Sequence, residues 1–193
     1  MKTIALPESL KTINSWCFFG CSELGSISIP KMVKRIGERV FTACSSLATI
    51  TVDEENKHFK AADNILFTKD GKTLVRYAPM SPGYLYDIPE NVTAIAESAF
   101  NFCTRLTSIT IPDSISVLSD FCFYGCSGLE YIGIPRSVIK IANYTFSKCS
   151  SLLSITIPDN VETIGNEAFS NCDSLTSIDI RNISTKICGD AFV

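Results

Sequence analysis

Cysteine is the residue type in this sequence that could do the most chemistry, with nine copies among 193 residues. The pairs Cys17/Cys21 and Cys122/Cys126 have a C-x-x-x-C spacing that could supply thiolate ligands to zinc. Neither pair has a histidine near it in the sequence to complete the ligand set. Buried free thiols, which pack as small apolar side chains, are one alternative, and disulfides between neighbouring cysteines are another. We expect mostly free, buried thiols, no metal and no cofactor.

Acid–base and nucleophilic chemistry finds little support in the other residues. His58 is the one histidine, and no Ser-His-Asp or Cys-His arrangement can be argued around it. The densest acidic run, residues 53–55, is interpreted as a solvated loop rather than a cation site. No glycine-rich phosphate loop occurs. We therefore predict that the protein is not an enzyme.

A repeat of 23 residues determines where the cysteines stand. Each repeat is anchored by a proline that follows a short apolar alternation, and an arginine takes the last anchor position. One gap between anchors is 59 residues, which is a repeat of 23 plus an insertion of 36. The anchors are Pro7, Pro30, Pro89, Pro112, Pro135, Pro158 and Arg181.

Seven apolar ladders keep a constant offset from these anchors. Aliphatic residues recur at positions +3, +6, +17, +20 and +22. Position +11 is always phenylalanine: Phe18, Phe41, Phe100, Phe123, Phe146, Phe169 and Phe192. Position +14 is cysteine in six repeats: Cys21, Cys44, Cys103, Cys126, Cys149 and Cys172. Six of the nine cysteines therefore face one direction in successive coils.

These offsets predict the course of one coil. Leu-x-x-Ile-x-Ile alternates with the period of a half-buried strand, and the anchor proline ends that strand because it has no N–H to donate. The segment around Ala-Phe is too short for a stable α-helix and predicts a single helical or 3₁₀ turn. No coil can bury its apolar residues alone, so each needs its neighbours. The expected fold is a right-handed solenoid with one short parallel strand and one helical turn per coil.

Length, charge and apolar runs exclude several other classes. Hydrophobic residues make up 46% of the chain and charged residues 19%, which is too apolar for a disordered protein. The formal net charge of −3 gives no basic footprint for nucleic acid. No apolar run is long enough for a membrane span, and the first residues do not resemble a signal peptide.

The repeat consensus Ile-Pro-x-x-Val-x-x-Ile-Gly-x-x-Ala-Phe-x-x-Cys-x-x-Leu-x-x-Ile-x-Ile resembles the BspA-like (treponemal-type) leucine-rich repeats. The clearest copy runs from residue 157 to residue 180, and the likeness covers nearly the whole chain. The resemblance implies an α/β horseshoe-like leucine-rich-repeat fold and a cell-surface or secreted protein. It also implies a role in adhesion or protein–protein binding, with host extracellular-matrix or serum proteins as candidate partners.

The insertion, residues 53–88, predicts an enlarged coil with a β-hairpin. Residues 65–68 and 73–77 read as its two strands, and Asp70 and Gly71 favour a tight turn between them. The insertion is structural in one interpretation and a protruding binding edge in the other.

On each strand, positions +19 and +21 point away from the core. They are Ser26/Ser28, Thr49/Thr51, Ser108/Thr110, Tyr131/Gly133, Ser154/Thr156 and Ser177/Asp179. Cross-strand pairs that keep this face soluble are one interpretation, and a polar recognition face is the other. Tyr131, the aromatic beside the gap at Gly133, and Asp179 are candidate partner-binding residues.

A second candidate surface lies on the edge of the coils. Phe121 and Tyr144 share position +9 in adjacent coils, and Tyr124 is close to both. An exposed aromatic cluster favours a protein interface. The alternative is that these rings pack against the neighbouring coil.

Together these features predict one domain over residues 1–193, acting as a non-catalytic binding module. Solenoids need polar caps, and the sequence has one at neither end, so we expect a fragment of a longer array or end-to-end self-association. A structural spacer and a targeting module of a larger surface hydrolase are the alternative functions. The expected partner is a protein, with no nucleic acid and no membrane span.

Overall fold

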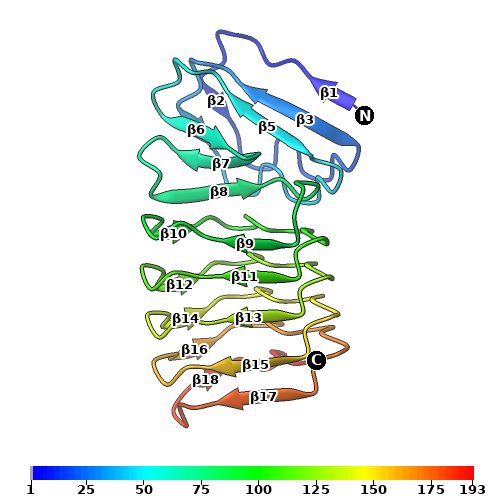
Figure 1. The fold of residues 1–193 in the computed structure, drawn as a ribbon, viewed down its shortest axis with the longest axis vertical. Helices are drawn as coiled ribbons and strands as arrows, with labels where there is room; N and C mark the ends of the chain where they lie inside the picture. Colours follow the sequence, from blue (N-terminus) through cyan, green and yellow to red (C-terminus); the bar gives the residue numbers. More distant parts are fainter. Residues whose placement is uncertain (1) are drawn as a thin grey trace.

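The computed structural model describes residues 2–193, and these residues form a β-solenoid of stacked coils (Figure 1). Two rows of short strands run along the stack. The first row contains β1 (Lys2–Ile4), β3 (Leu24–Ile29), β5 (Thr49–Val52), β9 (Leu85–Asp87), β11 (Ser108–Thr110), β13 (Tyr131–Gly133), β15 (Ser154–Ile157) and β17 (Ser177–Ile180). The second row contains β2 (Thr12–Ile13), β4 (Arg35–Ile36), β10 (Ala94–Ile95), β12 (Val117–Leu118), β14 (Lys140–Ile141), β16 (Thr163–Ile164) and β18 (Lys186–Ile187).

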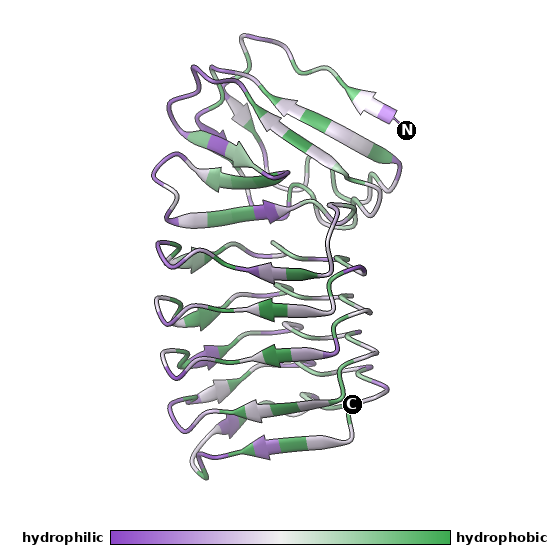
Figure 2. Ribbon diagram, viewed as in Figure 1, coloured by the Kyte–Doolittle hydropathy of each residue, from purple (hydrophilic) through white to green (hydrophobic). Residues whose placement is uncertain are grey.

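Strands within a row pair in parallel, with the register that the repeat predicts. Ser108 lies opposite Tyr131, and Ile109 lies opposite Ile132. Figure 2 shows apolar and polar residues alternating along strands such as β11 and β13. In the middle of the stack the central isoleucine of each strand points inward, as Ile109, Ile132 and Ile155 do, and the hydroxyl residues point outward. The solenoid and its 23-residue period are therefore confirmed.

The phenylalanine ladder forms the centre of the core. Successive rings from Phe123 through Phe146 and Phe169 to Phe192 stack with centroids 5.3 Å apart. Tyr77 of the enlarged coil stacks on Phe100 at 5.4 Å and so continues the same ladder. Offset stacks of this kind add to the free energy gained by burying the rings.

The expected helical turn is wrong, because residues 2–193 contain no helix. Hydrogen-bonded turns replace it, and the residues at positions +9 and +13 have left-handed backbone, as at Phe121 (φ 56°) and Gly125 (φ 72°). The N–H groups at +9, +11 and +13 donate to carbonyls of the next coil. In one coil these bonds run from Phe121 N to Asn143 O (3.0 Å), from Phe123 N to Thr145 O (2.9 Å) and from Gly125 N to Ser147 O (2.8 Å). A helix would use the same N–H groups within its own segment, so bonding between coils excludes it.

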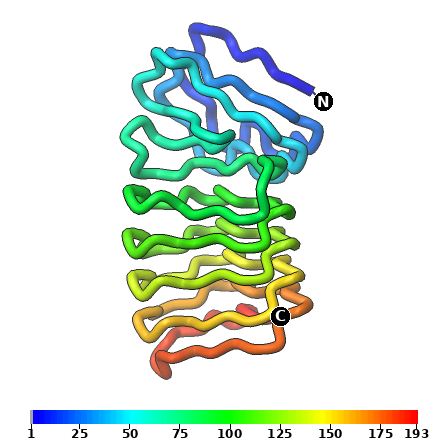
Figure 3. The backbone as a smooth tube through the Cα atoms, in the orientation of Figure 1, coloured from blue at the N-terminus to red at the C-terminus, as the bar shows by residue number. Residues whose placement is uncertain are grey.

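The insertion interrupts both rows. Strands β6 (Phe59–Ala62), β7 (Ile65–Thr68) and β8 (Thr73–Tyr77) form an antiparallel sheet, and β8 also pairs in parallel with β10. The second row is broken here, because β4 pairs with β2 and not with β8. Figure 3 shows the coils before the insertion tilted relative to the regular stack that follows it.

In the last coil of the structure, the side chains at the ladder positions are packed on one side only. Ile187 is 46% exposed and Phe192 is 39% exposed. End-to-end self-association stays a prediction. Along the described chain there is no helix of the length and apolarity that crossing a bilayer requires.

Candidate functional site

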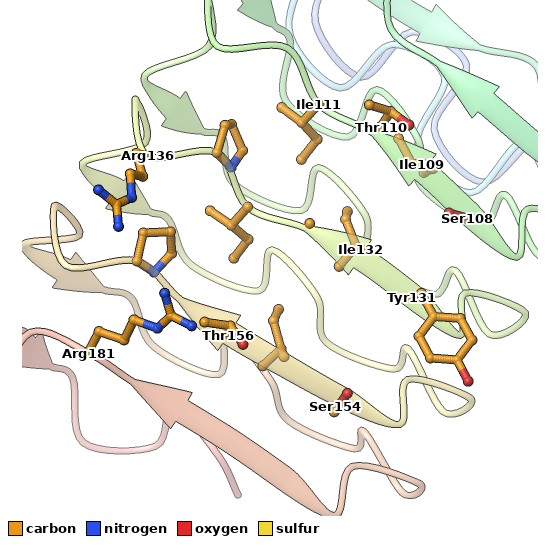
Figure 4. A pocket seen from close by; sticks show the side chains of 15 residues that line it. Ser108, Ile109, Thr110, Ile111, Tyr131, Ile132, Arg136, Ser154, Thr156 and Arg181 are labelled. Carbon is orange, nitrogen blue, oxygen red and sulfur yellow. The ribbon is translucent and has the colours of Figure 1, made fainter.

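A groove of about 640 Å³ lies on the outer face of the first strand row, over β11, β13 and β15 (Figure 4). Hydroxyl residues form much of its surface, with Tyr131 at one end and Arg136 and Arg181 at the other. The outward residues of the lining are Ser108, Thr110, Tyr131, Gly133, Ser154 and Thr156. The predicted hydroxyl face is therefore hollowed in the middle of the stack.

Gly133 makes this hollow possible. A Cβ added at Gly133 would have no atom within 4 Å, so the space above its backbone is open. Thr110 lies opposite Gly133 on the neighbouring strand. The exposed backbone of Gly133 can accept an extended segment or a flat group that a larger side chain would exclude.

Tyr131 offers the groove its aromatic contact, since 55% of the residue is exposed. Leu85 lies on the same outer position two strands away and is 73% exposed, with Ser108 between the two. Sequence reasoning missed Leu85 because the insertion hides the repeat, although counting 23 residues back from Ser108 would have found it. Apolar anchors around a polar strip are the usual composition of a protein interface.

The opposite end of the groove is positively charged. Arg136 is exposed and forms no ion pair within residues 2–193. Arg181 pairs with Asp179, with 3.2 Å between Nε and Oδ2, and both side chains are more than half exposed. Asp179 lies on β17, outside the groove lining, where it orients Arg181. An unpaired arginine beside an open groove can bind a carboxylate in a bidentate geometry.

The aromatic residues predicted on the coil edge form a separate cluster. Phe121 and Tyr144 stack with centroids 4.6 Å apart and ring planes 8° apart, and Tyr124 lies 5.6 Å from Phe121. The Tyr144 hydroxyl donates to Glu167 Oε1 at 2.9 Å. All three aromatic residues are half-buried, so they pack largely against one another. The structure thus places Tyr131 and Asp179 on one face and the other three candidates on the edge.

Arg39 extends the edge cluster in a way that sequence reasoning missed. Its guanidinium carbon lies 4.5 Å from the ring centroid of Phe121 and 5.1 Å from that of Trp16. Trp16 and Phe19 are about half exposed and contact each other at 5.1 Å. Arg39, Ser98 and Phe121 occupy position +9 after three successive anchors, and the small Ser98 lies between the other two. The repeat pattern predicts contacts between neighbouring coils, so it does not predict that Arg39 reaches Phe121.

The cysteine ladder is a structural element of the coils. All nine cysteines are free thiols. Three of them lie off the +14 ladder: Cys17 is exposed, Cys188 is half-buried and Cys122 is buried. In successive coils the +14 thiol donates to the carbonyl of the +11 residue in the coil before it. Examples are Cys126 Sγ to Phe100 O (3.1 Å) and Cys149 Sγ to Phe123 O (3.2 Å). Within residues 2–193 no group of three His, Cys, Asp or Glu side chains could hold a metal ion, and His58 is exposed.

Burial makes the ladder thiols poor nucleophiles. Desolvation raises the pKa of Cys103 to about 12 and that of Cys44 to about 11, from an ordinary value of 9.0. Because the thiolate is the reactive form, iodoacetamide at pH 8 should modify Cys17 first and leave the buried ladder thiols intact. Peptide mapping by mass spectrometry checks this, with protein in urea as the control in which all nine react. Rapid native labelling of Cys103 would contradict it.

The same raised pKa values predict that alkali destabilises the protein. Unfolded thiols lose their protons from about pH 9, whereas the folded ladder thiols keep theirs until about pH 11 to 12. The stability that the neutral thiols contribute is therefore complete below pH 9 and is lost as the pH rises toward 12. Urea midpoints measured from pH 8 to pH 10.5 should fall, and a flat profile would contradict this expectation.

Comparison with known families finds six copies of the BspA type leucine rich repeat region, over residues 1–68 and 85–193. Residues 69–84, which the matched repeats do not cover, lie within the insertion. A search of curated proteins finds no match.

Solved structures of bacterial leucine-rich repeat proteins share the fold. A protein from Eubacterium ventriosum is 25% identical, with a TM-score of 0.80 over 91% of this chain and 53% of its own. A leucine rich cell surface protein from Faecalibacterium prausnitzii is 30% identical, with a TM-score of 0.72 over 95% of this chain and 52% of its own. The pneumococcal vaccine antigen PcpA is 24% identical, with a TM-score of 0.77 over 100% of this chain and 60% of its own. The chain spans about half the length of the first two structures.

Proposed function

The chain belongs to the BspA-type leucine-rich repeat family, and from this membership we propose that it is a non-catalytic module that binds a protein through its strand face. The groove over β11, β13 and β15 carries the proposal. It combines an exposed aromatic ring at Tyr131, open backbone at Gly133 and a cationic end at Arg136 and Arg181. A segment that places an apolar side chain on Tyr131 and a carboxylate on the arginines fits this arrangement.

A cell-surface location accompanies this function. The 30% identical relative from Faecalibacterium prausnitzii is a cell surface protein, and 95% of this chain aligns with it. A surface module of this kind would meet proteins of the surroundings, for which extracellular-matrix and serum proteins are the candidates.

Replacing Tyr131 with alanine should weaken partner binding at least about tenfold, because removing an aromatic hot-spot residue typically costs about 2 kcal/mol or more. The measurement is a binding titration of the purified chain against a panel of extracellular-matrix and serum proteins. Two comparisons locate the surface. A Phe121→Ser/Tyr144→Ser variant disrupts the edge cluster, and Tyr84→Ala removes an equally exposed tyrosine outside the groove.

Each outcome selects one function. Saturable binding that is lost in Tyr131→Ala and kept in Tyr84→Ala supports the strand face as the recognition surface. Loss in the Phe121/Tyr144 variant alone assigns recognition to the edge cluster instead. If the folded chain binds no member of the panel, the spacer function gains support, and a catalytic domain encoded beside this one would point to a targeting module.

A further inference from the structure

A second cavity, of about 540 Å³, lies where the insertion breaks the second strand row. One wall is the edge of β4 that faces away from β2, with the turn that follows it, residues 34–42. The other wall comes from β8 of the insertion and from residues 96–98 of the next coil. The cavity shares no lining residue with the groove over β11, β13 and β15.

Two backbone carbonyls along this edge of β4 have no partner. In regular coils the carbonyls at +4 and +6 accept N–H groups of the next coil, as Ile141 O does from Gly165 N (2.9 Å). The equivalent atoms here are Lys34 O and Ile36 O, and neither accepts a hydrogen bond from any group in residues 2–193. An open strand edge of this kind is a template for pairing with another extended segment.

The insertion does not supply the missing partner strand. Strand β8 is already paired on both of its edges, with β7 and with β10. The side chain of Arg76 on β8 is directed to the next coil, where it donates to Ser98 O (2.6 Å) and Asn101 O (3.0 Å). The space beside β4 is therefore left open in the folded chain.

The walls of this space include apolar side chains. At position +6 the side chain is fully covered in regular coils, and Ile13 and Ile164 are 2% and 0% exposed. Ile36 at the same position is only half-buried, and so is Val75 of β8. Both residues pack against the core of the first coils and line the cavity. An aliphatic side chain that enters the cavity can therefore bury apolar surface on both walls.

The charges along β4 indicate which segment fits. Lys34 and Arg35 are exposed, as is Glu38 after the strand, and none of the three forms an ion pair within residues 2–193. In the parallel direction of this row, a second copy of β4 would place like charges opposite one another, which is unfavourable. A segment with acidic residues at its start and a basic residue after an aliphatic centre has the complementary charges.

We infer that the open edge of β4 binds an extended peptide segment of a partner protein as an additional parallel strand. The segment donates backbone N–H groups to Lys34 O and Ile36 O, as the next coil does elsewhere in the row. Its aliphatic side chain packs on Ile36 and Val75, and its acidic residues lie beside Lys34 and Arg35. In this mode of recognition main-chain hydrogen bonds give the affinity and the side chains give the specificity. The site is separate from the strand-face groove of the proposed function.

The test is a calorimetric titration of the full chain with the capped peptide Ser-Glu-Glu-Ile-Gly-Lys-Ser. In parallel register its two glutamates lie opposite Lys34 and Arg35, and its isoleucine lies opposite Ile36. Saturable binding is expected. At a tenfold excess of peptide over its Kd, hydrogen exchange of the Ile36 amide should slow about tenfold. This amide reports on the site, because the N–H and the carbonyl of one strand residue point to the same side.

Methylated peptides test whether the backbone makes the contact. Methyl groups on the amide nitrogens of the first glutamate and the glycine remove the two N–H groups that would donate to β4. Binding should weaken about tenfold or more, because two hydrogen bonds are lost. Methylation of the isoleucine nitrogen is the matched control, because that N–H points away from β4, and the affinity should stay within about twofold.

Variants of the chain locate the site. Arg35→Glu should weaken binding of the parent peptide about fivefold, because an attraction becomes a repulsion. Lys140→Glu is the matched control, since Lys140 occupies the same +5 position on β14, which is paired on both edges. It should keep the full affinity. Circular dichroism of each variant shows that folded proteins are compared.

Four results would overturn the inference. The first is no saturable binding up to the solubility limit of the peptide, and the second is equal affinity for the parent peptide and the doubly methylated one. The third is an equal loss for Lys140→Glu and Arg35→Glu, because only the net charge of the chain then matters. The fourth is loss of peptide binding in Tyr131→Ala, which would place the peptide in the strand-face groove.

Discussion

Replacing Asn56 with alanine is expected to lower the free energy of unfolding by about 4 kcal/mol or more. Asn56 is fully buried at the start of the enlarged coil and makes four hydrogen bonds. Its Nδ2 donates to Pro30 O (2.8 Å) and Val33 O (3.0 Å), and its Oδ1 accepts from the N–H groups of His58 and Phe59, both at 2.8 Å. Alanine would leave buried backbone groups unpaired, each at a cost of about 1–3 kcal/mol. Urea denaturation followed by circular dichroism measures the loss.

Two further variants make the Asn56 experiment specific. Asn56→Asp keeps the acceptor but places a buried carboxylate oxygen against the carbonyls of Pro30 and Val33, so its loss should be at least as large as that of alanine. Asn91→Ala, just after the anchor Pro89 of the next coil, removes a single bond, from Nδ2 to Gly71 O at 3.0 Å, and should cost about 1 kcal/mol. Equal losses of unfolding free energy for Asn91→Ala and Asn56→Ala would contradict the prediction, because the four hydrogen bonds of Asn56 would then stabilise the fold no more than the single bond of Asn91.

Phe146→Ala is expected to cost about 3–5 kcal/mol, the usual range for removing a large aromatic side chain from a core. Phe146 has no exposed surface and stacks on Phe123 and Phe169, both at 5.3 Å. Its removal leaves a cavity and breaks the ladder in the middle of the stack. Chemical denaturation monitored by far-ultraviolet circular dichroism gives the loss.

Phe192 provides the matched comparison, because it stacks on Phe169 at the same 5.3 Å but is 39% exposed and has a single stacking neighbour. Phe192→Ala should therefore cost only about 1 kcal/mol, in proportion to the smaller apolar area that it buries. If both variants lose the same stability, burial between neighbouring coils is not what makes the ladder stabilising.

The sequence was sufficient for the apolar pattern and the strand pairing that the regular coils share. The ladders at +11 and +14, the parallel register and the outward hydroxyl face follow from one period, since every coil repeats the same contacts. The period also drew attention to Tyr131 and Gly133, because most other coils have serine or threonine at the equivalent positions. The aromatic edge residues were also found, but their mutual stacking needed the structure.

What the sequence could not show depends on contacts outside the period. Asn56 and Arg76 lie where the insertion meets regular coils, and their side chains donate to backbone carbonyls of those coils. The residue types alone do not indicate which carbonyls accept these hydrogen bonds. The left-handed turns were missed for another reason. Position +9 holds Trp16, Arg39 and Phe121 among others, and such side chains give no sign of a positive φ.

The turns between coils have an electrical consequence. In the regular coils, the peptide N–H groups at +9, +11 and +13 all point toward the following coil, and their acceptor carbonyls all point back. Peptide dipoles in a sheet largely cancel because successive units alternate in direction. Here the aligned units add from coil to coil, as they do along an α-helix. The turn edge of this helix-free solenoid therefore carries a macrodipole along the stack, and each added coil lengthens it.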